Sequence, residues 1–137
     1  MATAKIIYQG GLRNKAVHLA SGQEILTDAP TDNHGKGEAF SPTDLTAMSL
    51  GACIITTMGI AGKKENIDYG LDDTELEITK IMSQDAPRRI AEIQVKITFS
   101  NKNLSSEHKA KLEKIAHSCP VALSLHPDIK QAITFVW

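Results

Sequence analysis

The chain has 137 residues, the size of one domain, and its 42% hydrophobic residues are enough for a core without disulfide bonds. The formal net charge is −1 and the basic residues are scattered, which argues against a nucleic-acid-binding surface. The first residues contain no apolar export signal, so we expect a cytoplasmic protein whose two cysteines are reduced, catalytic or metal-binding rather than structural.

The first forty residues predict three short strands followed by an irregular loop. Apolar segments over residues 2–9, 12–19 and 23–27 are separated by Gly-Gly and Ser-Gly turns, which is typical of an antiparallel meander. Residues 28–38 are dense in turn formers, so we expect a loop there.

The stretch Ser41–Gly62 predicts the central helix of the fold. Ser41 at the N-cap, Pro42 at the first helical position and Asp44 in the first turn are strong helix-start signals. No charged residue lies between Leu45 and Gly62, and apolar residues fall on every side, so we expect a helix buried all round. The run is long enough to span a membrane, but it is rich in Ser, Thr and Gly and no second apolar segment accompanies it, so we interpret it as a core helix.

The second half of the chain predicts a long hairpin, two helices and a closing strand. Residues 71–82 and 90–99 alternate between apolar and polar side chains, which indicates two paired strands with one buried face. A helix begins near Ser105, a short helix follows over Pro120–Ser124, and the last strand covers Lys130–Val136.

This order of elements predicts an α+β fold with antiparallel sheets around the central helix, in a single domain over residues 1–137. A helix that is apolar on every side needs cover on every side, and one small chain offers few layers. We therefore expect an intertwined homodimer, with no membrane or nucleic-acid partner.

Two cysteines and one arginine are the candidate chemical groups. Cys53 lies about ten residues into its helix, beyond the influence of the helix amino terminus. Burial alone would raise its pKa, so a reactive Cys53 needs a cation or a strong donor from another segment, and Arg13 is a candidate cation. Cys119 precedes Pro120 as the N-cap of the short helix, where backbone N–H groups favour a thiolate. Two thiols in unlike environments suit a division of labour.

Other interpretations of these residues remain open. A buried Cys53 can be a small hydrophobic residue, and Arg13 can be a solvated side chain. A metal site could draw on Cys53, Cys119, His117 and His18, although no CxxC or HxxxH pair is present. We expect neither a metal nor a cofactor.

Two passages resemble the cysteine motifs of the OsmC/Ohr family, the osmotically inducible protein C and organic hydroperoxide resistance proteins. They are FSPTDLTAMSLGACIITTM, which contains Cys53, and AHSCPVALSLHP, which contains Cys119. The resemblance implies an intertwined α+β homodimer with its active sites at the dimer interface. It also implies a thiol-dependent peroxidase that reduces organic hydroperoxides in oxidative stress defence, with an external dithiol as reductant.

The resemblance also implies individual roles. Cys53 would be the peroxidatic cysteine, Cys119 the resolving one, and Arg13 the arginine that stabilises the thiolate. The family's Glu after the motif proline, which orients the arginine, is replaced by Thr43, so Glu38 or Asp32 would have to substitute. The alternative function is a binding protein that holds a small apolar or thiol ligand at the dimer interface.

Overall fold

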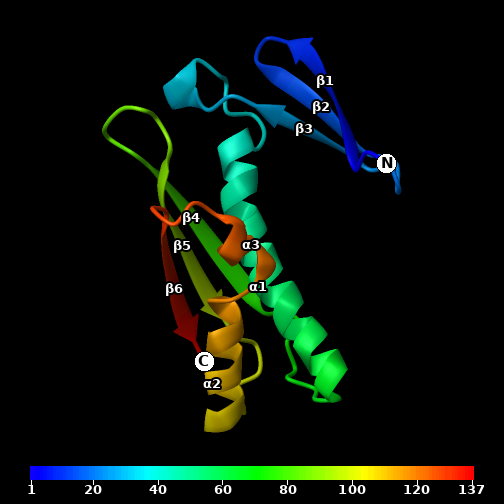
Figure 1. The fold of residues 1–137 in the computed structure, drawn as a ribbon, viewed down its shortest axis with the longest axis vertical. Coiled ribbons are helices and arrows are strands. Elements are labelled where there is room, and N and C mark those ends of the chain that lie inside the picture. Colours follow the sequence, from blue (N-terminus) through cyan, green and yellow to red (C-terminus); the bar gives the residue numbers. More distant parts are fainter. The chain divides into compact units, whose positions relative to one another are not determined.

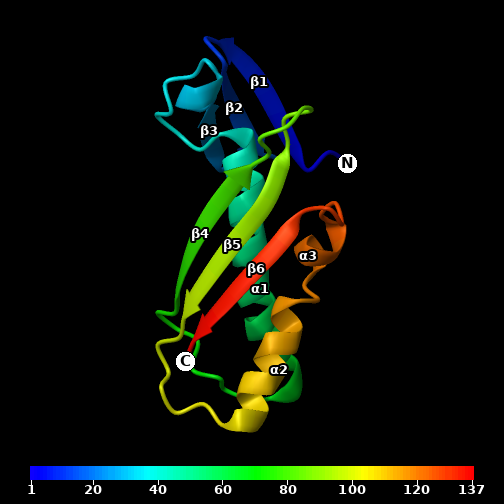
Figure 2. The same ribbon diagram turned by 90° about the vertical axis from the view of Figure 1, so that its left-hand side faces the viewer.

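The computed structural model describes all 137 residues and contains six strands, three α-helices and one short 3₁₀ helix (Figures 1 and 2). In chain order these are β1 (Ala4–Gly10), β2 (Arg13–His18), β3 (Glu24–Asp28), η1 (Thr31–Asn33), α1 (Pro42–Glu65), β4 (Glu75–Met82), β5 (Ile90–Thr98), α2 (Ser106–Ala116), α3 (Pro120–Ser124) and β6 (Lys130–Val136). The chain divides into two compact units, residues 1–46 and 47–137. The single domain over residues 1–137 stays a prediction.

The amino-terminal unit contains an antiparallel sheet in the order β1-β2-β3, which confirms the predicted meander. After β3 the chain forms a tight loop that includes η1. The Gly37 N–H donates to the Ala29 carbonyl oxygen at 3.2 Å, which closes this loop. Gly35 is required inside the loop, because a Cβ atom at this position would lie 1.7 Å from the same carbonyl oxygen.

The carboxy-terminal unit contains a second sheet in the order β4-β5-β6. β4 and β5 form the predicted antiparallel hairpin, but β6 pairs with β5 in the parallel direction, which corrects the expectation of antiparallel sheets. The reason is the connection. Between β5 and β6 the chain runs through α2 and α3, and such a helical crossover is what a parallel pair requires. The α+β fold class is confirmed.

The core lies between this sheet and the helices that pack along one of its faces (Figures 1 and 2). The inward side chains of β5 are fully buried, as their alternation predicts, and they are Ile93, Val95 and Ile97, with Phe99 just beyond the strand. Gly51 brings α1 close to the sheet, because a Cβ there would lie 2.4 Å from Ile78 Cδ1. This close packing fixes the position of the middle of α1, where Cys53 lies.

The start of α1 follows the sequence prediction. The Asp44 N–H donates to Ser41 Oγ at 3.1 Å, and the Ser41 N–H donates to Asp44 Oδ2 at 3.0 Å. The helix runs three residues beyond the expected end at Gly62, and the Ile67 N–H then closes it by donating to the Gly62 carbonyl oxygen at 2.9 Å.

Burial of α1 on every side is not found within one chain. The buried residues form a single stripe, namely Ala47, Leu50, Gly51, Ile54, Met58 and Gly62. The opposite side is exposed and includes Met48, Ala52, Thr56 and Ile60. The carboxy-terminal unit covers only one face of the helix, as expected of one small chain, and burial on every side, which needs a second copy, stays a prediction. The helix is long and apolar enough to cross a membrane, a test that the core helix of a soluble protein also passes.

Candidate functional site

The two cysteines come together in the carboxy-terminal unit. Cys53 lies in the middle of α1 and is half-buried, and Cys119 is the fully buried N-cap of α3. Both are free thiols, and they are within hydrogen-bonding reach of each other although 66 positions separate them in the sequence (119 − 53). One sulfur is therefore accessible from outside and the other lies behind it.

The surroundings of Cys53 favour its thiolate form. Burial is the largest single influence and raises the pKa of Cys53. Hydrogen bonds from the Val121 N–H, the Cys119 thiol and the Thr57 hydroxyl act in the opposite direction and outweigh it, so the pKa lies below the ordinary value. The Thr57 Oγ1 atom is 3.8 Å from the sulfur. The strong donor that a reactive Cys53 needs is thus supplied by α3, and no local sequence pattern links α3 to Cys53.

The surroundings of Cys119 favour its protonated thiol form. Burial raises the pKa of Cys119 and outweighs the Ala122 N–H, which donates to its sulfur at 3.4 Å. The hydrogen bond to Cys53 raises the pKa further, since Cys119 must keep its proton to donate it. Cys119 is the predicted N-cap, but the expectation that this position favours a thiolate was wrong. Desolvation and the neighbouring sulfur prevail over two amide donors, the Ala122 and Val121 N–H groups.

Arg13 belongs to the amino-terminal unit and is held there by two carboxylates. Its Nη2 atom lies 3.0 Å from Glu38 Oε2 and 3.3 Å from Asp28 Oδ2. Glu38 is one of the two substitutes that the sequence suggested. Asp32, the other, lies in η1 and is not among the partners of Arg13. Asp28 was missed, because the sequence marks it only as a turn residue.

Of the four residues of the metal hypothesis, only Cys53 and Cys119 come together. Nowhere in the chain do three or more His, Cys, Asp or Glu side chains lie close enough to hold a metal ion. His18 Nδ1 is 2.6 Å from Ser21 Oγ in the amino-terminal sheet. The His117 ring lies edge-on to Phe135, with 6.3 Å between ring centroids.

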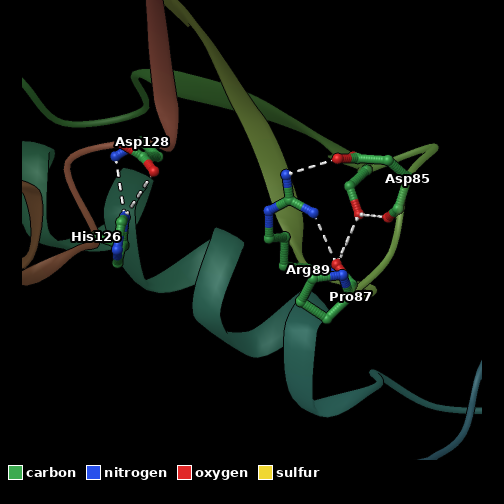
Figure 3. Close-up of polar contacts among 6 residues, drawn as sticks. Asp85, Pro87, Arg89, His126 and Asp128 are labelled. Atoms are coloured by element: carbon green, nitrogen blue, oxygen red, sulfur yellow. Dashed lines mark hydrogen bonds and ion pairs between the residues drawn. The ribbon is translucent and has the colours of Figure 1, made fainter.

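Charged groups beside α3 and at the turn between β4 and β5 are engaged locally (Figure 3). Arg89 donates to the Pro87 carbonyl oxygen at 2.7 Å and to Asp85 Oδ2 at 3.2 Å. His126 Nδ1 accepts from the Asp128 N–H at 3.0 Å. None of these groups is a partner of Cys53. Two hydrogen-bond donors outside α1 therefore lower the pKa of Cys53, the Val121 amide of α3 and the Cys119 thiol, and the amide has the larger effect.

A cleft of about 450 Å³ lies at the carboxyl end of α1. Gly59, Gly62, Asn66, Tyr69 and Asp72 are among its lining residues, and neither cysteine is. It is therefore separate from the thiol pair.

Comparison with known proteins identifies the family of the segment that contains both cysteines. The sequence matches the family of OsmC-like proteins over residues 35–134, which include both cysteines. The chain belongs to the OsmC-like protein family. No match was found among curated proteins.

Solved structures share the OsmC-like fold over nearly the whole chain. A protein of Psychrobacter arcticus 273-4, named with a provisional role in osmotic stress and detoxification response, is 48% identical with a TM-score of 0.90, covering 98% of this chain and 96% of that one. The organic hydroperoxide resistance protein OsmC of Legionella pneumophila is 16% identical with a TM-score of 0.73, covering 100% and 98%. The organic hydroperoxide resistance protein OhrB of Bacillus subtilis is 20% identical with a TM-score of 0.70, covering 98% of each chain.

Proposed function

We propose that this OsmC-like protein is a thiol-dependent peroxidase that reduces organic hydroperoxides in oxidative stress defence. Cys53 is the peroxidatic cysteine and Cys119 the resolving cysteine. The observation that carries the proposal is the hydrogen-bonded thiol pair, in which the accessible sulfur has a lowered pKa and the buried sulfur a raised one. The hydroperoxide resistance names of two proteins with the same fold support it.

The reaction requires one thiolate and one thiol. The Cys53 thiolate attacks the terminal oxygen of the hydroperoxide, the O–O bond breaks, and the alkoxide leaves and takes a proton to become the alcohol. Cys53 is then a sulfenic acid. The Cys119 thiol attacks that sulfur, which forms the Cys53–Cys119 disulfide and releases water. An external dithiol restores both thiols by exchange.

The roles of the two cysteines follow from their environments. The nucleophile must be ionised and reachable, and Cys53 is the half-buried sulfur whose thiolate accepts three hydrogen bonds. The resolving group must be near and must keep its proton until the sulfenic acid forms, and Cys119 is the buried thiol beside it. Arg13 is proposed as the cation that stabilises charge in this reaction.

The direct test is steady-state reduction of cumene hydroperoxide with a dithiol reductant. The wild-type protein is expected to turn over, Cys53→Ser is expected to be inactive, and Cys119→Ser is expected to react once without resolving. Ser118→Ala, beside Cys119 but exposed, is a matched control that leaves both thiols in place. Full activity of Cys53→Ser would show that the assignment is wrong.

We also propose that the protein acts as a homodimer, because the exposed side of α1 is apolar over more than two turns. Met48, Ala52 and Ile60 lie on this side without cover in the chain. A second copy of α1 is the partner that shares its length and composition. Light scattering is expected to give twice the mass of one chain, and Met48→Lys is expected to shift it toward the monomer, since it would bury a charge in the interface.

A binding protein without turnover is the competing outcome of the activity test. Such a protein would leave the hydroperoxide intact, while Cys53 would still react with an alkylating agent at pH values below the ordinary thiol pKa of about 8.5. Consumption of hydroperoxide with formation of the alcohol excludes this alternative.

A further inference from the structure

We propose that Gln131 is a positioning residue of the thiol site, which holds α3 in the rotation that keeps its first N–H groups on the two cysteine sulfurs. The proposal deepens the proposed function and rests on it, because it concerns the thiol that reacts. Gln131 is not a hydrogen-bond partner of either sulfur and acts through the backbone of α3.

Gln131 occupies a core-facing position of β6. It is opposite Ile93 in the parallel pairing of β5 and β6, and the Ile93 side chain is fully buried. Because side chains alternate between the two faces of a strand, Gln131 shares its face with Ile133 and Phe135, which pack against the core. A polar side chain in such an apolar row needs a hydrogen-bond partner, and the partner is on α3.

The partner of Gln131 is a carbonyl group in the last turn of α3. The Gln131 Nε2 atom donates to the Ala122 carbonyl oxygen at 2.9 Å, in a partly buried position. The last carbonyl groups of a helix have no donor inside it, and α3 has only five residues. The amide of Gln131 supplies a donor from outside the helix and joins α3 to the beginning of β6, beside which α3 lies (Figure 2).

Ala122 is therefore held at both ends of its backbone. Its N–H donates to Cys119 Sγ at 3.4 Å, and its carbonyl oxygen accepts from Gln131. The peptide group before it carries the Val121 N–H, which donates to the Cys53 sulfur. Because the peptide groups of one helical turn move together, a rotation of α3 that released the Ala122 carbonyl would also turn the Val121 N–H away from Cys53.

The remaining contacts of α3 are few. Ala122 is its one fully buried residue, and Leu123 is 73% exposed. The Ser124 hydroxyl donates to the Pro120 carbonyl oxygen at 2.7 Å, a bond within the helix that does not attach it to the sheet. A helix this short is not stable by itself, so its orientation depends on the groups that hold its two ends. The sulfurs hold the amino end, and Gln131 holds the carbonyl end.

The experiment measures the pH dependence of Cys53 alkylation by iodoacetamide in Gln131→Met, followed by mass spectrometry of the Cys53 peptide. Methionine keeps the length of the side chain and fits an apolar row, but it has no N–H donor. The apparent pKa of Cys53 is expected to rise by about half a unit because the Val121 amide is no longer held on the sulfur. Labelling at pH values below the pKa is then expected to slow about threefold.

Gln94→Met is the matched control. Gln94 lies on β5 of the same sheet, and its exposed side chain is on the opposite face, where Nε2 lies 3.4 Å from Glu92 Oε1. The variant makes the same chemical change without reaching α3, so Cys53 is expected to titrate as in the wild type.

The Val121 amide gives a second and direct readout. In an amide correlation NMR spectrum, a proton that donates to a sulfur is expected to shift as that sulfur ionises. The Val121 signal of the wild type is therefore expected to titrate together with Cys53. In Gln131→Met the size of this shift is expected to fall to about half or less, whereas a purely structural role of Gln131 would leave it unchanged. Where Gln131→Met fails to fold by circular dichroism, Gln131→Leu replaces it in both measurements.

The outcomes are distinct. An unchanged or lowered Cys53 pKa in the Gln131 variant, an equal rise in Gln94→Met, or a Val121 amide that titrates as in the wild type overturns the positioning role of Gln131. Full peroxidase activity of Cys53→Ser overturns the proposed function instead. Because alkylation and the amide titration need no turnover, the positioning role is tested whether or not the protein reduces hydroperoxides.

Discussion

The two units of the chain are stabilised by different kinds of interaction. Every buried hydrophobic side chain lies in the carboxy-terminal unit, from Ala47 to Ala122. In the amino-terminal unit the buried side chains are polar, namely Thr27, Asp28 and Ser41, and apolar side chains such as Ile6 and Leu26 are exposed. One unit is built on a core, and the other on strand pairing, a tight loop and an ion cluster.

The comparison indicates where each kind of chemistry can be placed. A packed core excludes water and fixes two sulfurs beside each other, which suits a thiol pair whose pKa values must differ. A polar cluster on a sheet holds a cation such as Arg13 in a set orientation while it remains within reach of solvent. A three-stranded sheet without its own apolar core is marginal in isolation, so its stability depends on such polar contacts.

The largest difference is expected for matched leucine truncations. Leu112 is fully buried, and Leu112→Ala is expected to lower the free energy of unfolding by about 3 kcal/mol because it leaves a cavity. Leu26 is 52% exposed, and Leu26→Ala is expected to cost less than about 1 kcal/mol. Urea denaturation measures both. An equal loss of unfolding free energy in both variants would show that Leu26 is buried in solution and would contradict the difference between the two units.

A loop glycine is expected to matter nearly as much as a core residue. Gly35→Ala is expected to destabilise the amino-terminal unit by about 2 kcal/mol, because its Cβ would overlap the Ala29 carbonyl and the loop cannot close. Lys36→Ala, an exposed side chain of the same loop, is the control and is expected to be close to neutral. Hydrogen exchange of the loop amides checks this, and similar protection in both variants would contradict it.

The thiol pair is expected to respond to loss of one donor. Cys119→Ala removes the hydrogen bond that the Cys119 thiol donates to Cys53, so the pKa of Cys53 is expected to rise. The rise is expected to be less than about one unit, because the Val121 amide and Thr57 remain as donors. Cys119→Ser, which retains a donor, is expected to show a smaller rise. The pH profile of iodoacetamide labelling measures the shift. A fall in the Cys53 pKa on removing the thiol would contradict the assigned direction of the hydrogen bond.

The smallest effect is expected in the acid stability of the ion cluster. The Glu38 N–H is the main cause that lowers the pKa of Asp28, with Arg13 adding to it and burial acting against both. A carboxyl whose pKa is lower when folded stabilises the protein above its unfolded pKa of about 3.9 and loses that contribution as the pH falls through the folded value. Asp28→Asn is therefore expected to flatten the loss of stability below about pH 4. If the urea midpoint changed with pH in the same way in the wild type and in Asp28→Asn, the pKa of Asp28 would not contribute to the acid stability.

Local signals in the sequence were sufficient for most of the elements. The serine and proline before α1, the alternation along β5 and the Cys119-Pro120 cap each depend on neighbouring residues, and the structure bears out all three. The direction of β6 could not be read this way, because it depends on how α2 and α3 cross the sheet. The face of α1 that the sheet covers could not be identified either, because apolar residues lie on every side of the helix in the sequence.

The partners within the candidate site required long-range information. Arg13 and Asp28 meet only through the register of β2 and β3, which a one-residue change in the turn between these strands would alter. The Val121 amide reaches Cys53 only because α3 is carried back by the crossover to β6. The sequence identified the reactive residue types, but their activating neighbours come from tertiary structure.

In the proposed reaction the accessible and the buried sulfur act on one hydroperoxide. The measurement that tests it most directly is peptide mapping of the protein after one equivalent of cumene hydroperoxide, without added reductant. We expect a Cys53–Cys119 disulfide within the chain and one equivalent of cumyl alcohol. Alcohol formation with both thiols still free, or a disulfide that joins other pairs, would contradict it.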